Sequence, residues 1–294
     1  MKGIEIVNYG GPEVAKVRTF SSPVRRAGEV MIQVVASSIN PVDIKYMTPE
    51  TIQKIPSFPA ILGWDIAGII IEADKNSNFS AGERVVAFHP QGSWQQLVAA
   101  SENQVVKLPD NIDFISGGSI PLAASTALQA LRRLRLEPGE RLLVTGAAGS
   151  VGYYALQFAL KMGVKASGLV RNKNQKMSIN LLDTEIYTND DPIPEFDAVF
   201  DTAGVLNRID VIHKGGRLVT VSDEQIDPQV LKHTSFAEHN YVRVNKEDLE
   251  EIVHLVSEAK IETRVAKIYS FNNVQEALAQ AIKSGNNGKV MLIF

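Results

Sequence analysis

A glycine-rich turn between a buried strand and a helix constrains this chain most strongly. Residues 141–145 form a short apolar run, residues 146–152 follow as a glycine-rich turn, and a helix is expected over 153–162. A second apolar strand is expected over 164–170. This order directs the backbone N–H groups of the first helical turn toward a phosphate, at the positive end of the helix. The segment therefore predicts a dinucleotide-binding βαβ unit.

The residues of the turn have separable roles in such a unit. Ala147, Gly149 and Gly152 occupy the three small positions of a G-x-G-x-x-G pattern, and alanine fits the first if its φ is negative. Gly149 would let the backbone approach a pyrophosphate, and Gly152 would let helix and strand pack closely. The residues expected to surround the phosphates are Ala148, Gly149, Ser150, Val151 and Gly152. A tight turn that binds nothing is the alternative interpretation.

The end of the second strand indicates which dinucleotide is bound. An acidic residue about 20 positions past the turn is typical of NAD sites, because it binds the ribose 2′-hydroxyl. Here Arg171, Asn172 and Lys176 stand in that region, and no carboxylate follows before Asp183. A cationic cluster suits a 2′-phosphate, so we predict NADPH as the cofactor. The alternative is that these are solvated loop cations.

The rest of the chain is a mixture of strands and helices. Residues 1–110 are rich in β-branched runs, with strands expected near 30–35 and 84–88, and the remainder alternates helices with strands. Helices are expected over 122–135, 246–259 and 273–284, and later strands over 198–200, 217–221, 241–244 and 288–294. Strands that alternate with helices predict an α/β protein with a parallel sheet.

Composition excludes several classes of function. The 30 basic and 33 acidic side chains among 294 residues give a net charge of −3, which argues against a general nucleic-acid binder. The chain has no cysteine, so disulfides, thiol nucleophiles and thiolate metal sites are excluded, and a reducing compartment is favoured. The most apolar stretch, 61–71, is too short to span a membrane. We expect a soluble cytoplasmic protein without a nucleic-acid or membrane partner.

Several short motifs, in a shared order, resemble the medium-chain dehydrogenase/reductase superfamily and its zinc-free NADPH:quinone oxidoreductase-like branch. They are Asn40-Pro41-Val42-Asp43, the 59–68 stretch with Gly63, Asp65 and Gly68, Gly82-Glu83-Arg84-Val85 (with Glu where the family has Asp), 92–94, 121–131 and 288–290. The resemblance implies an α/β fold in which a Rossmann dinucleotide-binding domain, with a parallel doubly wound sheet, is inserted in a GroES-like β-rich catalytic domain. The implied parts are 1–112 and 264–294 for the catalytic domain and 113–263 for the NADP-binding domain, with the active cleft between them.

The resemblance also addresses zinc. Zinc members of the family carry a cysteine at the position of Asn40 and a His-Glu pair at the position of Trp64-Asp65, so we predict no metal site. The five histidines are scattered and show no paired ligand spacing. Without a Lewis acid, the hydride acceptor must delocalise charge itself, as a quinone or an α,β-unsaturated carbonyl does.

Three site residues follow from the resemblance, each with a plainer alternative. Asn40 would lie near the nicotinamide as a catalytic and cofactor-binding residue, or it satisfies a loop backbone. Thr126 would lie at the nicotinamide face in the same two roles, or it bonds its own helix backbone. Tyr187 would lie near the adenosine end, or it is a half-buried strand aromatic.

The loops after two further strands should border the cofactor, because they end at the carboxyl edge of the sheet. The residues expected there are Thr202, Ala203, Val221 and Ser222. Asp43 is expected to be structural, although it could line the floor of the cleft, and Trp64 is expected to be a packing residue. Lys289 is expected to be a cation at a strand edge, the alternative being that it reaches a cofactor phosphate.

The predicted function is a zinc-independent oxidoreductase that transfers hydride from NADPH to a quinone or an α,β-unsaturated carbonyl. A homodimer is expected, formed through an edge strand at 217–221. The adenosine rim is shorter than in most of the family between 172 and 197, with further loss after 204. The alternative is therefore a non-catalytic NADPH-binding redox sensor or structural protein on the same fold.

Overall fold

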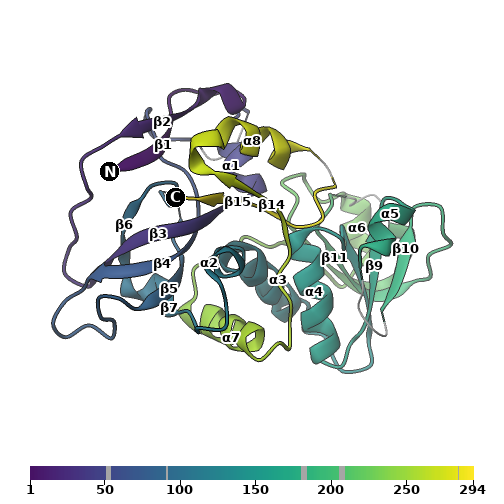
Figure 1. The fold of residues 1–294 in the computed structure, drawn as a ribbon. Helices are drawn as coiled ribbons and strands as arrows, with labels where there is room; N and C mark the ends of the chain where they lie inside the picture. Colours follow the sequence, from purple (N-terminus) through teal and green to yellow (C-terminus); the bar gives the residue numbers. More distant parts are fainter. Residues whose placement is uncertain (51–53, 91, 180–183, 205–208, 284) are drawn as a thin grey trace. The chain divides into compact units, whose positions relative to one another are not determined.

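The protein folds into two compact units. The structure is a computed structural model that describes residues 1–50, 54–90, 92–179, 184–204, 209–283 and 285–294. Unit 1 comprises Met1–Leu122 and Val244–Phe294, and unit 2 comprises Ala123–Arg243. Unit 2 is therefore an insertion in unit 1, and the chain returns to its first unit at the end (Figure 1).

Unit 1 is built on a seven-stranded sheet. Six strands lie in the order β14-β15-β3-β4-β5-β7, β6 pairs with β3, and a separate β1-β2 hairpin is antiparallel. Only the β14-β15 pair of the larger sheet is parallel. The strands are β1 (Lys2–Ile6), β2 (Ala15–Thr19), β3 (Glu29–Ile39), β4 (Asp65–Glu72), β5 (Arg84–Phe88), β6 (Leu97–Ser101), β7 (Val105–Lys107), β14 (Val265–Ser270) and β15 (Lys289–Ile293).

Short helices connect and cover these strands. The α-helices of unit 1 are α1 (Pro41–Tyr46), α2 (Phe114–Gly118), α7 (Lys246–Ser257) and α8 (Val274–Ile282), and its 3₁₀ turns are η1 (Pro12–Val14), η2 (Glu102–Gln104) and η4 (Phe271–Asn273). Helix α8 packs against α1 and η1, so the end of the chain contacts its beginning (Figure 1). Helix α7 packs against β7.

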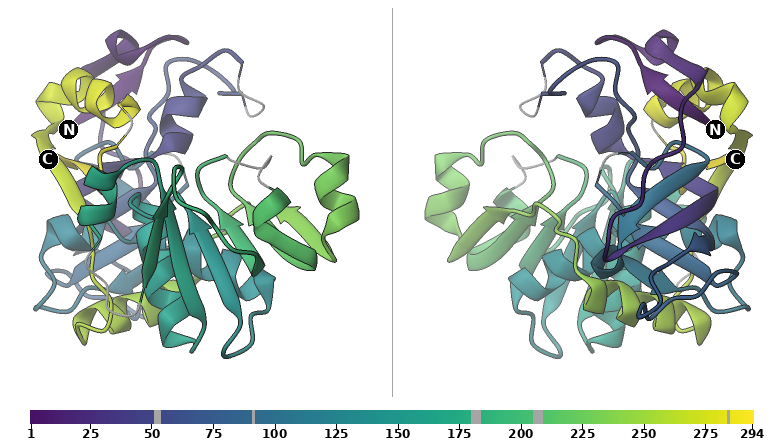
Figure 2. Two further views of the ribbon diagram at one scale, coloured as in Figure 1. Left: turned by 90° about the vertical axis from the view of Figure 1, so that its right-hand side faces the viewer. Right: turned by 90° about the vertical axis from the view of Figure 1, so that its left-hand side faces the viewer.

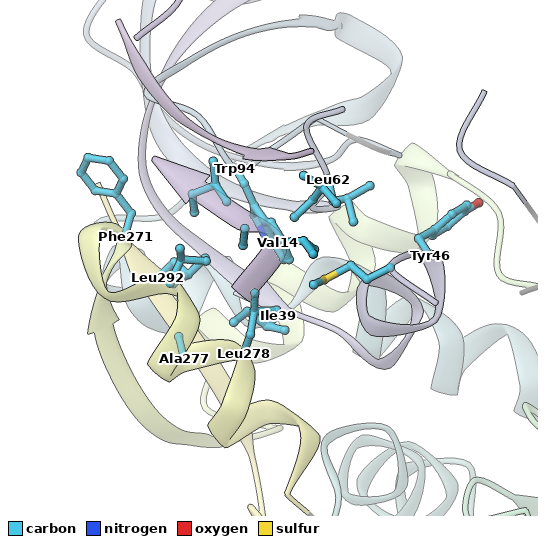
Figure 3. Close-up of a cluster of buried hydrophobic side chains, with 14 of the residues drawn as sticks. Val14, Ile39, Tyr46, Leu62, Trp94, Phe271, Ala277, Leu278 and Leu292 are labelled. Carbon is cyan, nitrogen blue, oxygen red and sulfur yellow. The ribbon is translucent and has the colours of Figure 1, made fainter. Parts of the chain in front are cut away.

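The core of unit 1 joins the two ends of the chain. One cluster of buried apolar side chains combines Trp94 and Ile39 from the first segment with Leu278 and Leu292 from the last (Figure 3). A second cluster, around Ile66 and Val85, lies on the β3-β4-β5 strands. Because apolar burial is the main favourable term in folding, the last segment is an integral part of this unit.

Unit 2 contains a six-stranded, all-parallel sheet. The strand order is β10-β9-β8-β11-β12-β13, and the strands lie side by side in the left view of Figure 2. Numbered along the chain, this is the order 3-2-1-4-5-6 of a doubly wound dinucleotide fold. The strands are β8 (Arg141–Thr145), β9 (Lys165–Val170), β10 (Glu185–Thr188), β11 (Phe196–Asp201), β12 (Ile212–Thr220) and β13 (Phe236–His239).

Helix α3 (Pro121–Leu134) begins in unit 1 and leads into the first strand of this sheet. The connections between strands contain α4 (Ser150–Lys161), α5 (Lys173–Met177), α6 (Pro228–His233) and the 3₁₀ turn η3 (Ile209–Val211), whereas residues 189–195, between β10 and β11, form no helix. The predicted fold class, a Rossmann domain inserted in a GroES-like β-rich domain, is confirmed by the two sheets and their strand orders. Among the described residues, no helix has both the length and the apolar character that a membrane span needs.

Two strand predictions for unit 2 are wrong. The strand expected at 241–244 lies earlier in the chain, as β13 (Phe236–His239). The hydrogen bond from the N–H of Asn240 to the carbonyl of Thr220 is the last between this segment and β12, so the chain leaves the sheet after Asn240. The expected edge strand at 217–221 belongs to β12, which pairs with β11 on one side and β13 on the other. Strand β13 is therefore the last strand of the sheet on that side among the described residues.

The helix of the glycine turn begins earlier than expected, at Ser150 rather than at residue 153. The unit boundaries also differ from those expected from the sequence. The first lies after Leu122 rather than after residue 112, and the second lies after Arg243 rather than after residue 263. The amphipathic pattern of 246–259 shows that this helix has an apolar face. It does not show which sheet that face covers.

A candidate dinucleotide site and a buried ion cluster

The glycine turn of unit 2 has the geometry of a phosphate-binding turn. Gly146 has a φ of 61°, a left-handed conformation that favours glycine. The φ of Ala147 is not positive, so alanine fits that position of the turn. Gly149 is the N-cap of α4 and makes no side-chain cap hydrogen bond. The first N–H groups of a helix have no acceptor within the helix, so this turn presents donors to a ligand.

The glycines of this turn are required for two different reasons. A Cβ on Gly152 would lie 2.5 Å from the carbonyl oxygen of Gly146 and 2.8 Å from the Cα of Ala147, so helix and turn pack too closely for a side chain. A Cβ on Gly149 meets only the Gly146 carbonyl oxygen, at 3.2 Å, so its outer side is open. Gly168 in β9 is also a packing glycine, because a Cβ there would lie 2.7 Å from that of Ala147.

The rim after β9 carries the cations expected to meet a 2′-phosphate. Arg171 is exposed, and its guanidinium has no ion-pair partner among the described residues. Asn172 is the N-cap of α5 and accepts from the N–H of Gln175 at 3.0 Å. The Asn172 side chain therefore orders the loop. Arg171 remains the cation that is available to an anionic ligand.

A carboxylate that the sequence analysis missed lies on the same rim. The Oδ2 of Asp191 is 3.8 Å from the Nζ of Lys176. Hydrogen bonds from the backbone N–H and hydroxyl of Thr188, at 2.8 and 3.0 Å, hold the pKa of Asp191 below its usual range. Because β10 pairs in parallel with β9, its carboxyl end brings Asp191 beside the cluster. The Thr188-x-x-Asp191 turn was the available sequence signal. Asp183 lies outside the described residues.

Tyr187 lies in β10 and is buried, with its ring edge-on to Phe196 at a centroid distance of 6.3 Å. Its hydroxyl donates to Glu185 at 2.5 Å. Burial, followed by this hydrogen bond to Glu185, raises the pKa of Tyr187 to about 12. Tyr187 is thus a buried strand aromatic in the core of unit 2, and its place near the adenosine end stays a prediction.

A buried aspartate ties together the carboxyl ends of three strands in unit 2. The Oδ1 of Asp201 accepts from the hydroxyl of Thr145 at 2.6 Å, and its Oδ2 accepts from the hydroxyl of Thr220 at 3.0 Å. Thr202 and Ala203 donate their backbone N–H groups to the Thr145 hydroxyl at 3.0 and 3.2 Å. The loops after β8, β11 and β12 are thereby fixed at one edge of the sheet.

The other predicted residues of unit 2 lie at this same edge. Ser222 donates its N–H to the hydroxyl of Thr220 at 2.9 Å, and Val221 donates to the carbonyl of Asp201 at 3.0 Å. Thr126 is buried in α3, and its carbonyl accepts from the Nδ2 of Asn240 at 3.1 Å. Unit 2 thus brings together the glycine turn, the loops after β11 and β12, and Thr126. The sequence analysis did not identify Asn240.

Asn40 lies in unit 1 and belongs to a buried ion cluster. Its Nδ2 donates to the Oδ2 of Asp65 at 2.9 Å, and its Oδ1 accepts from the ammonium of Lys289. The same ammonium donates to the hydroxyl of Ser38 at 2.9 Å and to the Oδ2 of Asp65 at 3.1 Å. The Asn40 amide is thus engaged within unit 1. The role of Asn40 at the nicotinamide stays a prediction.

Lys289 corrects an expectation. It was expected as a strand-edge cation, but only 4% of its surface is exposed, and it pairs with Asp65, which is fully buried. Strand β15, which carries Lys289, lies between β14 and β3, so the lysine is in the interior of the sheet rather than at an edge. Its three N–H donors meet three acceptors, as a buried ammonium requires.

A second buried carboxylate lies next to this cluster. Asp43, at the third position of α1, accepts from the N–H groups of Asn40 and Gly63 at 2.8 and 3.1 Å. Complete burial raises the pKa of Asp43 to about 7, although these two hydrogen bonds favour the charged form. The structural role expected for Asp43 agrees with these contacts.

The positions aligned with zinc ligands form no ligand set. Asp65 is occupied on both oxygens, since its Oδ1 accepts from the N–H of Leu122 at 2.7 Å and its Oδ2 faces Lys289. Trp64 packs near Tyr46 and Phe88. Within the described ranges, no group of three His, Asp or Glu side chains could hold a metal ion.

Comparisons with known proteins agree with this architecture. Residues 26–110 match the family model of the alcohol dehydrogenase GroES-like domain, and residues 179–292 match that of the zinc-binding dehydrogenases. The chain is 27% identical over 324 residues to a quinone oxidoreductase of Mus musculus, covering all of this chain and 98% of the relative. It is 28% identical over 250 residues to an NADPH-dependent alkenal/one oxidoreductase of Arabidopsis thaliana, covering 78% of this chain and 64% of the relative. The structure of Escherichia coli quinone oxidoreductase complexed with NADPH shares the fold, with a TM-score of 0.88 at 23% identity and full coverage of both chains.

Proposed function

Since the chain belongs to the medium-chain dehydrogenase/reductase superfamily, in its quinone oxidoreductase-like branch, we propose that this oxidoreductase transfers hydride from NADPH to a quinone or an α,β-unsaturated carbonyl. The observation that carries the proposal is the first turn of α4. This turn presents backbone N–H donors and has no side-chain cap. It follows Gly149, where an added Cβ would meet only the carbonyl oxygen of Gly146. The names of the mouse and Arabidopsis relatives support the two acceptor classes.

The rim after β9 supports NADPH over NADH. Arg171 stands where an acidic residue would bind an unmodified ribose, and Arg can bind a phosphate through two parallel hydrogen bonds. Asp191 pairs with Lys176 on this rim and leaves Arg171 as the cation for the 2′-phosphate. Bound NADPH would supply the hydride. The chain would hold the phosphates and fix the loops after β11 and β12.

The acceptor class follows from the buried cluster of unit 1. At the positions of zinc ligands this chain has Asn40, Trp64 and Asp65, and a lysine ammonium already neutralises the carboxylate. Such a site has no Lewis acid to stabilise an alkoxide, so the acceptor must spread the incoming charge over its own π-system. Water can then protonate the reduced product.

The direct test is NADPH oxidation, followed at 340 nm, with a panel of quinones and 2-alkenals and with NADH as the comparison. We expect turnover with NADPH and at least one acceptor class. Absence of turnover with every acceptor would contradict the proposal. If calorimetry showed NADPH binding without any turnover, the non-catalytic redox sensor or structural protein would be favoured instead.

The cofactor preference has its own test. Replacing Arg171 with alanine should weaken NADPH binding roughly tenfold or more, because a charge-assisted hydrogen bond to phosphate is lost, and should leave NADH binding unchanged. Lys176→Ala is the matched control with a smaller expected effect, since that ammonium lies near Asp191. Fluorescence titration of both cofactors provides the measurement, and equal losses for NADPH and NADH would contradict the assignment of Arg171.

We further infer a homodimer, now through β13, because this strand ends the sheet of unit 2 on that side among the described residues. Light scattering of the purified protein tests the oligomeric state. A cytoplasmic location fits the absence of cysteine, since reducing compartments do not support disulfides.

A further inference from the structure

One buried oxygen of unit 2 lacks a hydrogen-bond donor. The Oδ1 of Asn240 is among the few buried side-chain polar atoms for which no partner is present in the described part of the chain. Asn240 is 5% exposed, directly follows β13, and is held by its own N–H, which donates to the carbonyl of Thr220 at 2.7 Å. Buried acceptors are nearly always satisfied by protein, water or a ligand, so this oxygen needs an explanation.

The orientation of the Asn240 amide is determined by its neighbour. Its Nδ2 donates to the carbonyl oxygen of Thr126 at 3.1 Å. A carbonyl oxygen can only accept, so the nitrogen must face Thr126, and the amide cannot be turned to exchange its two ends. The unpaired Oδ1 is therefore an acceptor in a fixed position, beside a residue of the carboxyl edge of the sheet.

The strand order indicates which part of a dinucleotide lies near this oxygen. The glycine turn for the pyrophosphate follows β8, and Arg171, for the 2′-phosphate of the adenosine half, follows β9. In the order β10-β9-β8-β11-β12-β13, the adenosine half thus extends from β8 toward β9. The nicotinamide half must extend the other way, over β11 and β12 toward β13, whose end carries Asn240.

We propose that Asn240 is a specificity-determining residue whose Oδ1 accepts a hydrogen bond from the carboxamide NH₂ of the nicotinamide. This inference rests on the proposed function and adds a binding residue to it. The carboxamide nitrogen is a donor at the far end of the nicotinamide half, where an acceptor without a partner is available. The bond from Nδ2 to Thr126 holds that acceptor in place.

A cycle of two ligands and two proteins tests the proposal by calorimetry, without turnover. The ligands are NADP⁺ and its 3-acetylpyridine analogue, in which a methyl group replaces only the NH₂ of the carboxamide. The proteins are the wild type and Asn240→Leu, which keeps the branching at Cγ and removes the acceptor together with the Nδ2 donor. A general disturbance weakens both ligands equally, whereas a lost hydrogen bond changes their ratio.

We expect the wild type to bind NADP⁺ about tenfold more tightly than the analogue, and Asn240→Leu to bind both alike. An equal affinity of the wild type for the two ligands, or an unchanged preference in the variant, would overturn the proposal and assign the oxygen to a water molecule. Asn240→Ser serves as a second, smaller variant with the same expected loss of preference.

Binding of 2′,5′-ADP, which contains only the adenosine half, is the control. It should be the same in the wild type and both variants, which shows that unit 2 is folded. If the wild type bound neither 2′,5′-ADP nor NADP⁺, the proposed function itself would fail. If it bound both and the ligand ratio did not respond to Asn240, only this inference would fail.

Discussion

At the scale of single residues, the buried pair of Lys289 and Asp65 is the most costly feature of unit 1 to disturb. Removing one partner of a buried ion pair leaves an unpaired charge in the interior. We expect Lys289→Met to lower the free energy of unfolding by about 3–5 kcal/mol in urea denaturation. The matched control is Lys267→Met, since Lys267 is an exposed lysine of β14 whose ammonium donates to the side chain of Gln280.

The double variant Lys289→Met with Asp65→Asn should recover part of this loss, because no bare charge remains buried. A Lys289→Met protein as stable as the control would show that the ammonium is not needed in the interior. The Asn40 amide would then have to be held by other groups.

Asp43 predicts a pH dependence of stability at the same scale. Its pKa is about 7 in the folded protein, above the value of about 3.9 of an unfolded chain, so the native state binds more protons between these values. The contribution of Asp43 to stability is therefore full below about pH 4 and is lost as the pH rises to about 7. Because a neutral amide replaces the protonated carboxyl, the melting temperature of the wild type should fall relative to that of Asp43→Asn as the pH rises through this range. Parallel curves would contradict the prediction.

At the scale of elements, we expect two glycines of the β8-α4 turn to have different roles: Gly152 is needed for folding and Gly149 for binding of the cofactor. Gly152→Ala should destabilise the protein by about 1–3 kcal/mol, since its Cβ would meet the backbone of Gly146 and Ala147. Gly149→Ala has a compatible φ of −76° and a Cβ that would meet one carbonyl oxygen at 3.2 Å, so it should lower the melting temperature less than Gly152→Ala and weaken NADPH binding. Thermal unfolding and cofactor titration of both variants make the comparison. Equal changes in melting temperature and in NADPH affinity for the two variants would contradict these separate roles.

Local sequence patterns predicted where helices and strands lie better than they predicted which other elements these contact. The glycine turn, β9 and α7 follow from apolar periodicity and turn residues within short windows. The strand at 236–239 was missed because Phe236–His239 carries two polar residues and pairs on only one side, with β12. Which sheet α7 covers depends on contacts with β7, far away in the sequence, and no local pattern contains that information.

The site divides in the same way. The phosphate-binding turn could be predicted because its geometry is set by a few consecutive residues. Asp191 and Asn240 could not, because they reach the site through the pairing of β10 with β9 and of β13 with β12. The burial of Lys289 escaped prediction because its partner Asp65 is 224 residues earlier in the chain.

At the scale of the whole molecule, the insertion of unit 2 predicts that the two units depend differently on the last strand. A chain shortened to end before Lys289 lacks β15, which lies between β14 and β3 and supplies part of the unit 1 core. We expect unit 1 to lose hydrogen-exchange protection, while unit 2, which has its own core, still binds 2′,5′-ADP. Full protection of β3 and β4 in the shortened chain would contradict this dependence.

The return of the chain to unit 1 also has a consequence for its synthesis. Residues 1–122 are made before unit 2, but the strand that completes their sheet and the ammonium that neutralises Asp65 are made only after it. Unit 2 is contiguous and can fold as soon as residue 243 has emerged, because domains fold as units during translation. The segment 1–122 therefore waits with an open edge on β3 until β15 has emerged, and that interval is when the nascent chain most needs protection by chaperones.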